Sequence, residues 1–143
     1  MKLQSGEGST LHYAANWDVD TASITTQVEG VTALSGFEMS LETLSAILLE
    51  SGATLTAPGN LTFGDVEVGI LADGDTDQYA TLHGLALAKT PLSILGHFST
   101  GKGVDVEANV FITKVSQVTE SGALNAYTIT LSVSGIPDFK HAS

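Results

Sequence analysis

The chain has 143 residues, enough for one domain with a sizeable core, and 43% of them are hydrophobic while only 15% are charged. Five Lys and Arg residues against 16 Asp and Glu residues give a net charge of −11. This balance argues against tight nucleic-acid binding and against attraction to an anionic membrane, because both depend on cations. Cysteine is absent, which excludes disulfides and thiolate sites.

The charged fraction lies below the quarter that is usual for a globular domain. This indicates that part of the surface is covered by other subunits, although a surface rich in Ser and Thr is the alternative explanation. The N-terminal segment lacks the apolar core of a signal peptide, and no apolar run reaches the length of a membrane span. We therefore expect a soluble protein made in the cytoplasm, without a membrane anchor.

Residues 1–22 show no clear period, and their Gly and Ser residues predict a loop-like N-terminal arm. The large side chains of Tyr13 and Trp17 could anchor this arm on the body or on a neighbour. Residues 23–34 are rich in β-branched residues and predict a strand broken at Gly30, and Gly36 predicts a tight bend.

The next segment is the least regular. Apolar residues alternate with polar ones over residues 37–42, which predicts a half-buried strand. Residues 41–49 fit either a strand or a short helix, because leucines also recur there at helical spacing. Residues 51–62 are predicted to form a loop, with Pro58-Gly59 as its turn.

Alternation over residues 66–70 predicts a strand, and residues 77–88 predict an amphipathic helix that begins after an N-cap at Asp75 or Thr76 and ends before Pro91. A short strand is expected over residues 93–98. The predicted buried face of the helix consists of Tyr79, Leu82, Leu85 and Ala86.

Two long alternating runs, residues 106–113 and 127–134, predict an antiparallel hairpin with one apolar and one hydroxyl-rich face. A shift in the alternation at Lys114-Val115 indicates a bulge, residues 120–122 indicate the turn, and Pro137 is expected to end the last strand. The predicted fold is mainly β (α+β): an antiparallel β-sandwich or barrel-like domain with one flanking α-helix and a long C-terminal hairpin. Residues 1–22 form its arm, residues 23–139 the domain and residues 140–143 a C-terminal tail.

Few residues are arranged as in a catalytic, metal-binding or phosphate-binding site. Acidic residues alternate over residues 73–77, but Gln78 and Gly84 stand where a calcium loop of the EF-hand type requires Gly and Glu. None of the four histidines has a partner at metal-binding spacing, and the Gly-Lys-Gly segment at residues 101–103 lacks the spacing of a phosphate loop. The sequence therefore predicts no catalytic residue, no metal site, no cofactor and no enzymatic activity.

Four segments, in this order, resemble the tail tube (major tail) proteins of long-tailed bacteriophages. They are residues 30–36 (GVTALSG), 49–51 (LES), 57–66 (APGNLTFGDV) and 127–137 (YTITLSVSGIP). The resemblance covers roughly residues 24–139. The chain departs from it over residues 41–47, and residues 1–22 have no counterpart in the pattern.

The resemblance implies a structural subunit that self-assembles into hexameric rings, which stack into a virion tail tube through which DNA passes without tight binding. It also implies tape-measure, tail-tip and tail-terminator partners. Because acids repel phosphates, we expect Glu107 and Glu120 to face the lumen. We expect contacts between subunits to involve Trp17 in the arm and, in the loop over residues 51–62, the residues Pro58, Gly59 and Asn60.

Three alternatives remain open. The first is a tube protein of a related contractile injection or type VI-like system, or a tail terminator of similar fold. The second is an acidic β-sandwich that binds sugar or decorates a capsid, which would require an exposed aromatic patch although aromatic residues make up only 6% of the chain. The third is an enzyme, for which the required residues are missing.

Overall fold

A computed structural model describes residues 9–71, 77–99, 102–118 and 125–141. Most of them belong to strands, and the described residues also form one α-helix and one short 3-10 helix. In chain order the elements are β1 (Thr10–Ala15), η1 (Thr21–Ser23), β2 (Thr26–Gln27), β3 (Val31–Ser35), β4 (Met39–Ile47), β5 (Thr54–Phe63), β6 (Val66–Leu71), α1 (Gln78–Leu87), β7 (Leu92–Phe98), β8 (Val104–Val118) and β9 (Ala126–His141).

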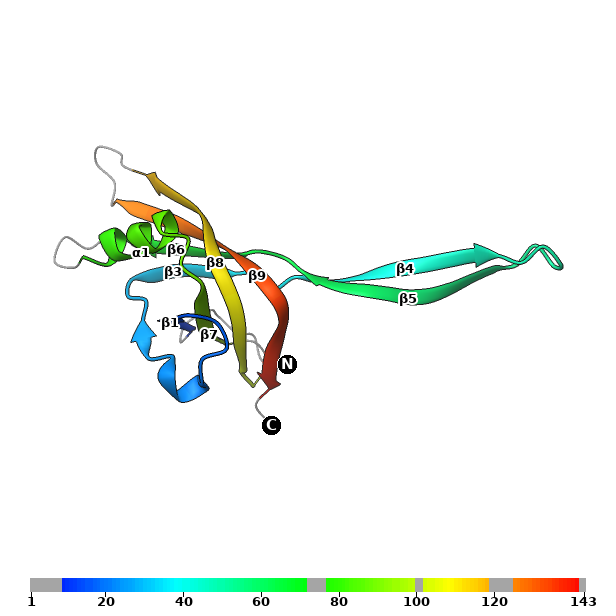
Figure 1. Ribbon diagram of the computed structural model, residues 1–143, viewed down its shortest axis with the longest axis horizontal. Coiled ribbons are helices and arrows are strands. Elements are labelled where there is room, and N and C mark those ends of the chain that lie inside the picture. Colours follow the sequence, from blue (N-terminus) through cyan, green and yellow to red (C-terminus); the bar gives the residue numbers. More distant parts are fainter. Residues whose placement is uncertain (1–8, 72–76, 100–101, 119–124, 142–143) are drawn as a thin grey trace.

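The body of the molecule is a 7-stranded antiparallel sheet in the order β2-β1-β7-β8-β9-β6-β3. The sheet curls on itself, and α1 packs against it (Figure 1). Strands β4 and β5 pair only with each other and form a long ribbon that leaves the body. The predicted fold class, mainly β with one helix, is confirmed.

One face of the curled sheet forms the core. In β8 every second residue from Val106 to Ile112 is buried, and so are Tyr127, Ile129 and Leu131 in β9, as their alternation predicted. The predicted bulge is confirmed as a register shift between Ile112 and Lys114. The remaining buried apolar side chains come from β1, β6, β7 and α1 and from the segments beside β2 and β3: Leu11, Ile24, Val28, Phe37, Val66, Val68, Ile70, Leu82, Leu92 and Ile94.

The helix lies where the sequence predicts it. Leu82 is buried, and Tyr79 meets the ring of Tyr127 edge-on with centroids 5.0 Å apart. The other two residues of the predicted face, Leu85 and Ala86, are half-buried against the core, which confirms that face. Asp77 occupies the N-cap position, while the two N-cap residues predicted from the sequence lie outside the described residues.

Two predictions near the ends of the chain are wrong. The N-terminal arm is not loop-like throughout, because residues 10–15 form β1, which pairs along its length with β7 inside the sheet. The last strand does not end at Pro137 but continues to His141. Pro137 is tolerated because the register shifts opposite Ala108, and a proline at such a bulge removes no ladder hydrogen bond.

The region around residues 39–63 also differs from expectation. Residues 41–49 are largely strand β4, which settles the choice left open by the sequence. The predicted loop over residues 51–62 is wrong: most of it is strand β5, in which Pro58 is a paired residue and Gly59 belongs to a bulge, not to a turn. The half-buried strand predicted over residues 37–42 is wrong, because the strand begins at Met39 and all of it is exposed, while the buried Phe37 precedes it.

Candidate assembly surfaces

The β4–β5 ribbon leaves the body at a sharply bent junction. Gly36 has a φ of +142° and Phe37 a φ of +55°, both in the region that favours glycine. A Cβ on Gly36 would lie 2.6 Å from the Cα of Val66, so the chain passes β6 too closely for any side chain there. The Gly64 N–H donates to the Glu38 carbonyl over 2.8 Å and closes the base of the ribbon.

Aromatic rings fix this junction to the sheet. Phe37, which is buried, meets Phe98 and Phe139 edge-on with centroids 5.9 and 6.1 Å apart. Phe63, at the end of β5, lies 5.8 Å from Phe139. Beside these rings an open groove of about 240 Å³ is lined by Phe37, Phe98, Val104 and Phe139 among others. The ribbon is therefore held at its base and free along the rest of its length.

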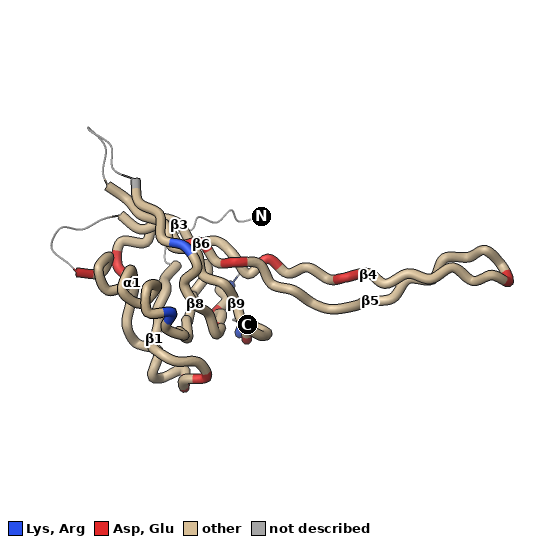
Figure 2. Tube along the Cα trace, turned by 45° about the horizontal axis from the view of Figure 1, so that its top comes forward, with Lys and Arg blue, Asp and Glu red and all other residues tan. Residues whose placement is uncertain are grey.

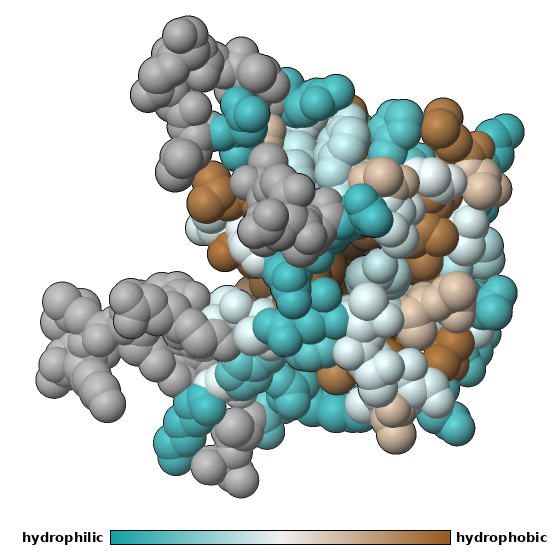
Figure 3. Space-filling view, turned by 90° about the vertical axis from the view of Figure 1, so that its left-hand side faces the viewer, coloured by the Kyte–Doolittle hydropathy of each residue, from teal (hydrophilic) through white to brown (hydrophobic). Residues whose placement is uncertain are grey.

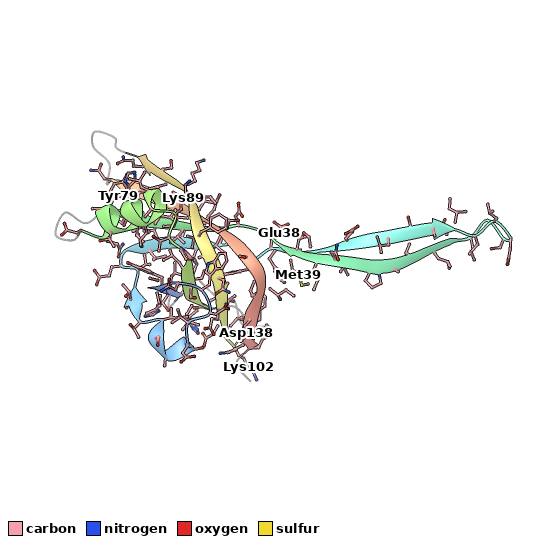
Figure 4. The ribbon with its side chains drawn as sticks, viewed as in Figure 1. Glu38, Met39, Tyr79, Lys89, Lys102 and Asp138 are labelled. Atoms are coloured by element: carbon pink, nitrogen blue, oxygen red, sulfur yellow. The ribbon has the colours of Figure 1, made fainter. Side chains whose placement is uncertain are left out.

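Beyond the junction the ribbon exposes large apolar side chains. Leu49 at the tip is 100% exposed, Ile47 is 69% exposed and Met39 is 66% exposed. The same element exposes Leu41, Leu44, Leu48, Leu55 and Leu61. Side chains stand out from both faces of the ribbon, and Glu38 and Met39 mark its start (Figure 4). Exposed large apolar side chains gathered on one element mark an interaction site.

The charges of the ribbon are all acidic. Between Glu38 and Phe63 the sequence contains Glu38, Glu42 and Glu50 and neither Lys nor Arg. The described lysines all belong to the body, as Figure 2 shows. They are Lys89 after α1, Lys102 before β8, Lys114 in β8 and Lys140 in β9.

Three of the predicted contact residues, the consecutive Pro58, Gly59 and Asn60, lie in the middle of the ribbon. The ladder pairs Leu41 with Leu61 and Thr43 with Pro58, so Gly59 and Asn60 together face the single residue Glu42. A Cβ on Gly59 would lie 3.2 Å from the Glu42 carbonyl oxygen and its Cβ, which favours glycine at this bulge.

The fourth predicted contact residue, Trp17, lies on the body. Its side chain is 41% exposed, and its Nε1–H donates to the Val110 carbonyl of β8 over 2.9 Å. The neighbouring Asp18 and Asn109 exchange two hydrogen bonds of 3.0 and 2.9 Å. This segment therefore covers part of the outward face of β8, and the structure does not bring Trp17 together with the bulge on the ribbon.

The outward face of β9 is hydroxyl-rich, as its sequence predicts, with Thr128, Thr130, Ser132 and Ser134 at alternate positions. Ladder partners place Glu67 of β6 and Lys114 of β8 on either side of Thr130. Sequence analysis missed Glu67, although its place between the buried Val66 and Val68 already pointed it outward.

The two predicted lumen residues have different outcomes. The side chain of Glu107 lies on the outward face, where its Oε2 accepts a 2.7 Å hydrogen bond from Thr21 Oγ1 and lies 3.7 Å from Lys140 Nζ. The side chain is only partly exposed because the segment before β2 covers it. Glu120 lies outside the described residues.

The described residues contain no group of three or more His, Asp or Glu side chains able to hold a metal ion. No helix in the described ranges is long and apolar enough to cross a membrane. Seen from the side away from the ribbon, the body mixes hydrophilic and hydrophobic residues (Figure 3). The projecting ribbon and the outward face of the sheet are thus the candidate assembly surfaces of this molecule.

Comparison with known proteins gives structural neighbours only. No family model and no curated protein matches the chain. The fold is similar to the sheath/tube terminator of an extracellular contractile injection system in its extended state, with a TM-score of 0.68, 13% identity and 99% of each chain covered. It is similar to a chain of a native gene transfer agent virion, with a TM-score of 0.70, 15% identity and coverage of 97% of this chain and 100% of the other.

A third neighbour is the SPP1 tail tube, with a TM-score of 0.62, 8% identity and coverage of 94% of this chain and 77% of the other. The chain therefore has the fold shared by tail tube and tube terminator proteins, over almost its whole length. At these identities the likeness concerns the fold.

Proposed function

We propose that this protein is a structural subunit of a phage-like tail, which self-assembles into rings that stack into a tube for genome DNA. In this proposal it is not an enzyme. Its place is the virion tail, and its partners are further copies of itself together with tape-measure, tail-tip and terminator proteins. The fold shared with tail tube and terminator proteins supports this assignment.

The observation that carries the proposal is the β4–β5 ribbon. It exposes many large apolar side chains and makes few contacts with its own body, apart from its aromatic base. At about 25 cal/mol per Å² of apolar surface, leaving such an element in water is unfavourable, and burial against other copies removes that cost. A copy that buries its ribbon in a neighbour while receiving another ribbon makes a heterologous contact, which generates rings or filaments.

Two further observations support a hexameric ring with a DNA lumen. The tail of a gene transfer agent, another neighbour with a TM-score of 0.70 and 14% identity, is described with C6 symmetry. The outward face of β6, β8 and β9 combines hydroxyl groups with four acids (Glu67, Asp105, Glu107, Asp138) against two lysines (Lys114, Lys140). A wall of this composition repels phosphates and is suited to a conduit.

A tube terminator is the second candidate, because two neighbours covering 99% of this chain are terminators: the one above and the tube-terminating cap of the anti-feeding prophage. A tube subunit adds rings indefinitely, whereas a terminator stops at one ring or caps an existing tube. The length of the assemblies therefore separates the two candidates.

The test is negative-stain microscopy and sedimentation of the purified protein beside a ribbon-less variant. Replacing residues 39–63 by Gly-Gly turns Glu38 and Gly64 into the ends of a β-turn closed by the hydrogen bond already present. We expect long tubes from the full chain and folded monomers from the variant. Single rings would favour the terminator, and dispersed monomers of the full chain would overturn the proposal.

A further inference from the structure

The apolar residues of the ribbon lie on two opposite faces. Near the body, Met39 pairs with Phe63 and Leu41 pairs with Leu61. Because side chains alternate along a strand, these residues share one face, and the exposed ones, Met39, Leu41 and Leu61, form the proximal patch. Toward the tip, Leu44 pairs with Ala57 and Ala46 pairs with Leu55.

These distal residues stand on the other face. Leu44 follows Leu41 by an odd number of positions in the continuous strand β4, so the two side chains point in opposite directions. We call Leu44, Ala46, Leu55 and Ala57 the distal patch. On the face of the distal patch, the half of the ribbon near the body is polar, with Ser40, Glu42 and Thr62. On the face of the proximal patch, the half toward the tip carries Thr43, Ser45 and Thr56 and ends in the exposed Ile47.

The bulge at Gly59 and Asn60 makes this arrangement possible in both strands. Leu61 lies an even number of positions after Leu55, so in a regular strand the two side chains would share a face. The extra residue opposite Glu42 reverses the alternation of β5 at the same point where the leucines of β4 change face. Each patch is thereby built from both strands and stays continuous across the ladder.

We propose that the ribbon is held between two different copies of this chain, one covering the proximal patch and the other covering the distal patch from the opposite side. This inference rests on the proposed self-assembly. A single partner that covers one face of a two-stranded ribbon leaves the apolar patch on the other face in water.

An open apolar groove on the body, with Lys102 two residues before one of its lining residues, fits the apolar and acidic ribbon and identifies the occupants as copies of the same chain. The ribbon carries only acids, and the body of another copy offers the lysines that the ribbon lacks. Lys102 precedes Val104, which lines the open apolar groove beside Phe98, and Lys102 forms no ion pair with any described residue. The ribbon cannot reach its own body, because beyond its base it extends directly away from the sheet (Figure 1).

Photo-crosslinking tests the two-sided contact directly. The chain has no cysteine, so the variants Leu41→Cys and Leu55→Cys each carry a single thiol for a benzophenone maleimide. Each labelled variant is assembled with an excess of unlabelled protein, irradiated, and mapped by mass spectrometry. We expect crosslinks from the two positions to fall in two non-overlapping segments of the body. Crosslinks from both positions to the same segment would overturn the inference and leave the proposed function standing.

A one-residue insertion provides the second test. A Thr inserted between Glu42 and Thr43 pairs with Gly59, removes the bulge and keeps every other ladder pair. Leu41 and Leu44 then lie on one face, with an unchanged set of apolar residues. We expect the association constant to fall by at least about tenfold, the loss from exposing one or two leucines.

The matched control is a Gly inserted after Glu50 at the ribbon tip, which lengthens the ribbon's turn without changing the face of either patch. Monomer folding of both variants is followed by circular dichroism, and we expect it to be unchanged because the ribbon contacts the body only at its base. Equal assembly of the bulge insertion and the turn insertion would contradict two-sided docking. If the natural chain does not assemble at all, the proposed function fails and this inference fails with it.

Discussion

At the scale of single residues, two adjacent positions direct the whole ribbon. Gly36 and Phe37 both have a positive φ, and the chain between β3 and β4 passes against β6 with no room for a Cβ at Gly36. The cost of the left-handed conformation at Phe37 is offset by burial of its ring between Phe98 and Phe139. The strain is thus located where the ribbon changes direction away from the sheet.

Gly36→Ala should therefore destabilise the fold, and Gly84→Ala serves as its matched control. Alanine at Gly36 combines a positive φ with a 2.6 Å contact to Val66 Cα, so we expect a loss of more than about 1 kcal/mol in the free energy of unfolding. Gly84 lies inside α1 with open space around it, and alanine there should stabilise by up to about 1 kcal/mol. Urea unfolding of the ribbon-less chain measures both, and equal effects would show that the junction is not constrained.

At the scale of elements, the helix and the ribbon differ in how firmly they pack against the body. α1 closes over the core through one buried side chain, Leu82, and the edge-on contact of Tyr79 with Tyr127. Gln78 adds hydrogen bonds to the Glu29 backbone and to the Tyr127 hydroxyl, which tie the helix to the β2–β3 connection. The ribbon has no comparable anchors beyond its base. The helix therefore serves stability, whereas in the proposed assembly the ribbon serves association.

This division predicts different results for two leucines of the same helix. Leu82→Ala removes a buried side chain and should cost about 3 kcal/mol in the free energy of unfolding. Leu87→Ala, at a position 72% exposed, should change it by less than about 0.5 kcal/mol. Thermal or urea denaturation of the ribbon-less chain separates these effects from assembly. A large loss for Leu87→Ala would mean that the helix packs differently.

At the scale of the whole molecule, the charge of −11 bears on what the proposed tube would carry. Cations on a lumen wall bind phosphates and retard DNA, while acids repel it. Glu67 and Lys114 flank Thr130 on the hydroxyl-rich face, so a single substitution there changes the local charge strongly.

Glu67→Lys should therefore give tubes that retain DNA. We expect the variant tubes to co-sediment with short duplex DNA at low salt, and the binding to disappear as salt rises because it depends on counterion release. Glu67→Gln removes the acid without adding a cation and should bind far less. If tubes of Glu67→Lys do not co-sediment with DNA, the outward face of β6 and β9 does not line the lumen.

Local pattern was enough to predict most of the body. The strands over residues 66–70 and 93–98, the helix, and the long C-terminal hairpin with its bulge all follow from alternation and helical spacing, because each buries one face in a single core. The acidic balance and the lack of chemical motifs also came from the sequence. The order of short motifs suggested a tail-tube-like fold, which the structural neighbours support.

Only the tertiary structure decided what happens at residues 39–63 and 10–15. Apolar alternation ordinarily signals burial, and Pro58-Gly59 ordinarily signals a turn, so the sequence predicted a half-buried strand followed by a loop. The structure instead makes an exposed ribbon in which Pro58 pairs with Thr43, and Gly59 and Asn60 form a bulge opposite Glu42. The physical reason is that alternation along the sequence does not specify which surface covers a strand, and the monomer's own core does not cover this one.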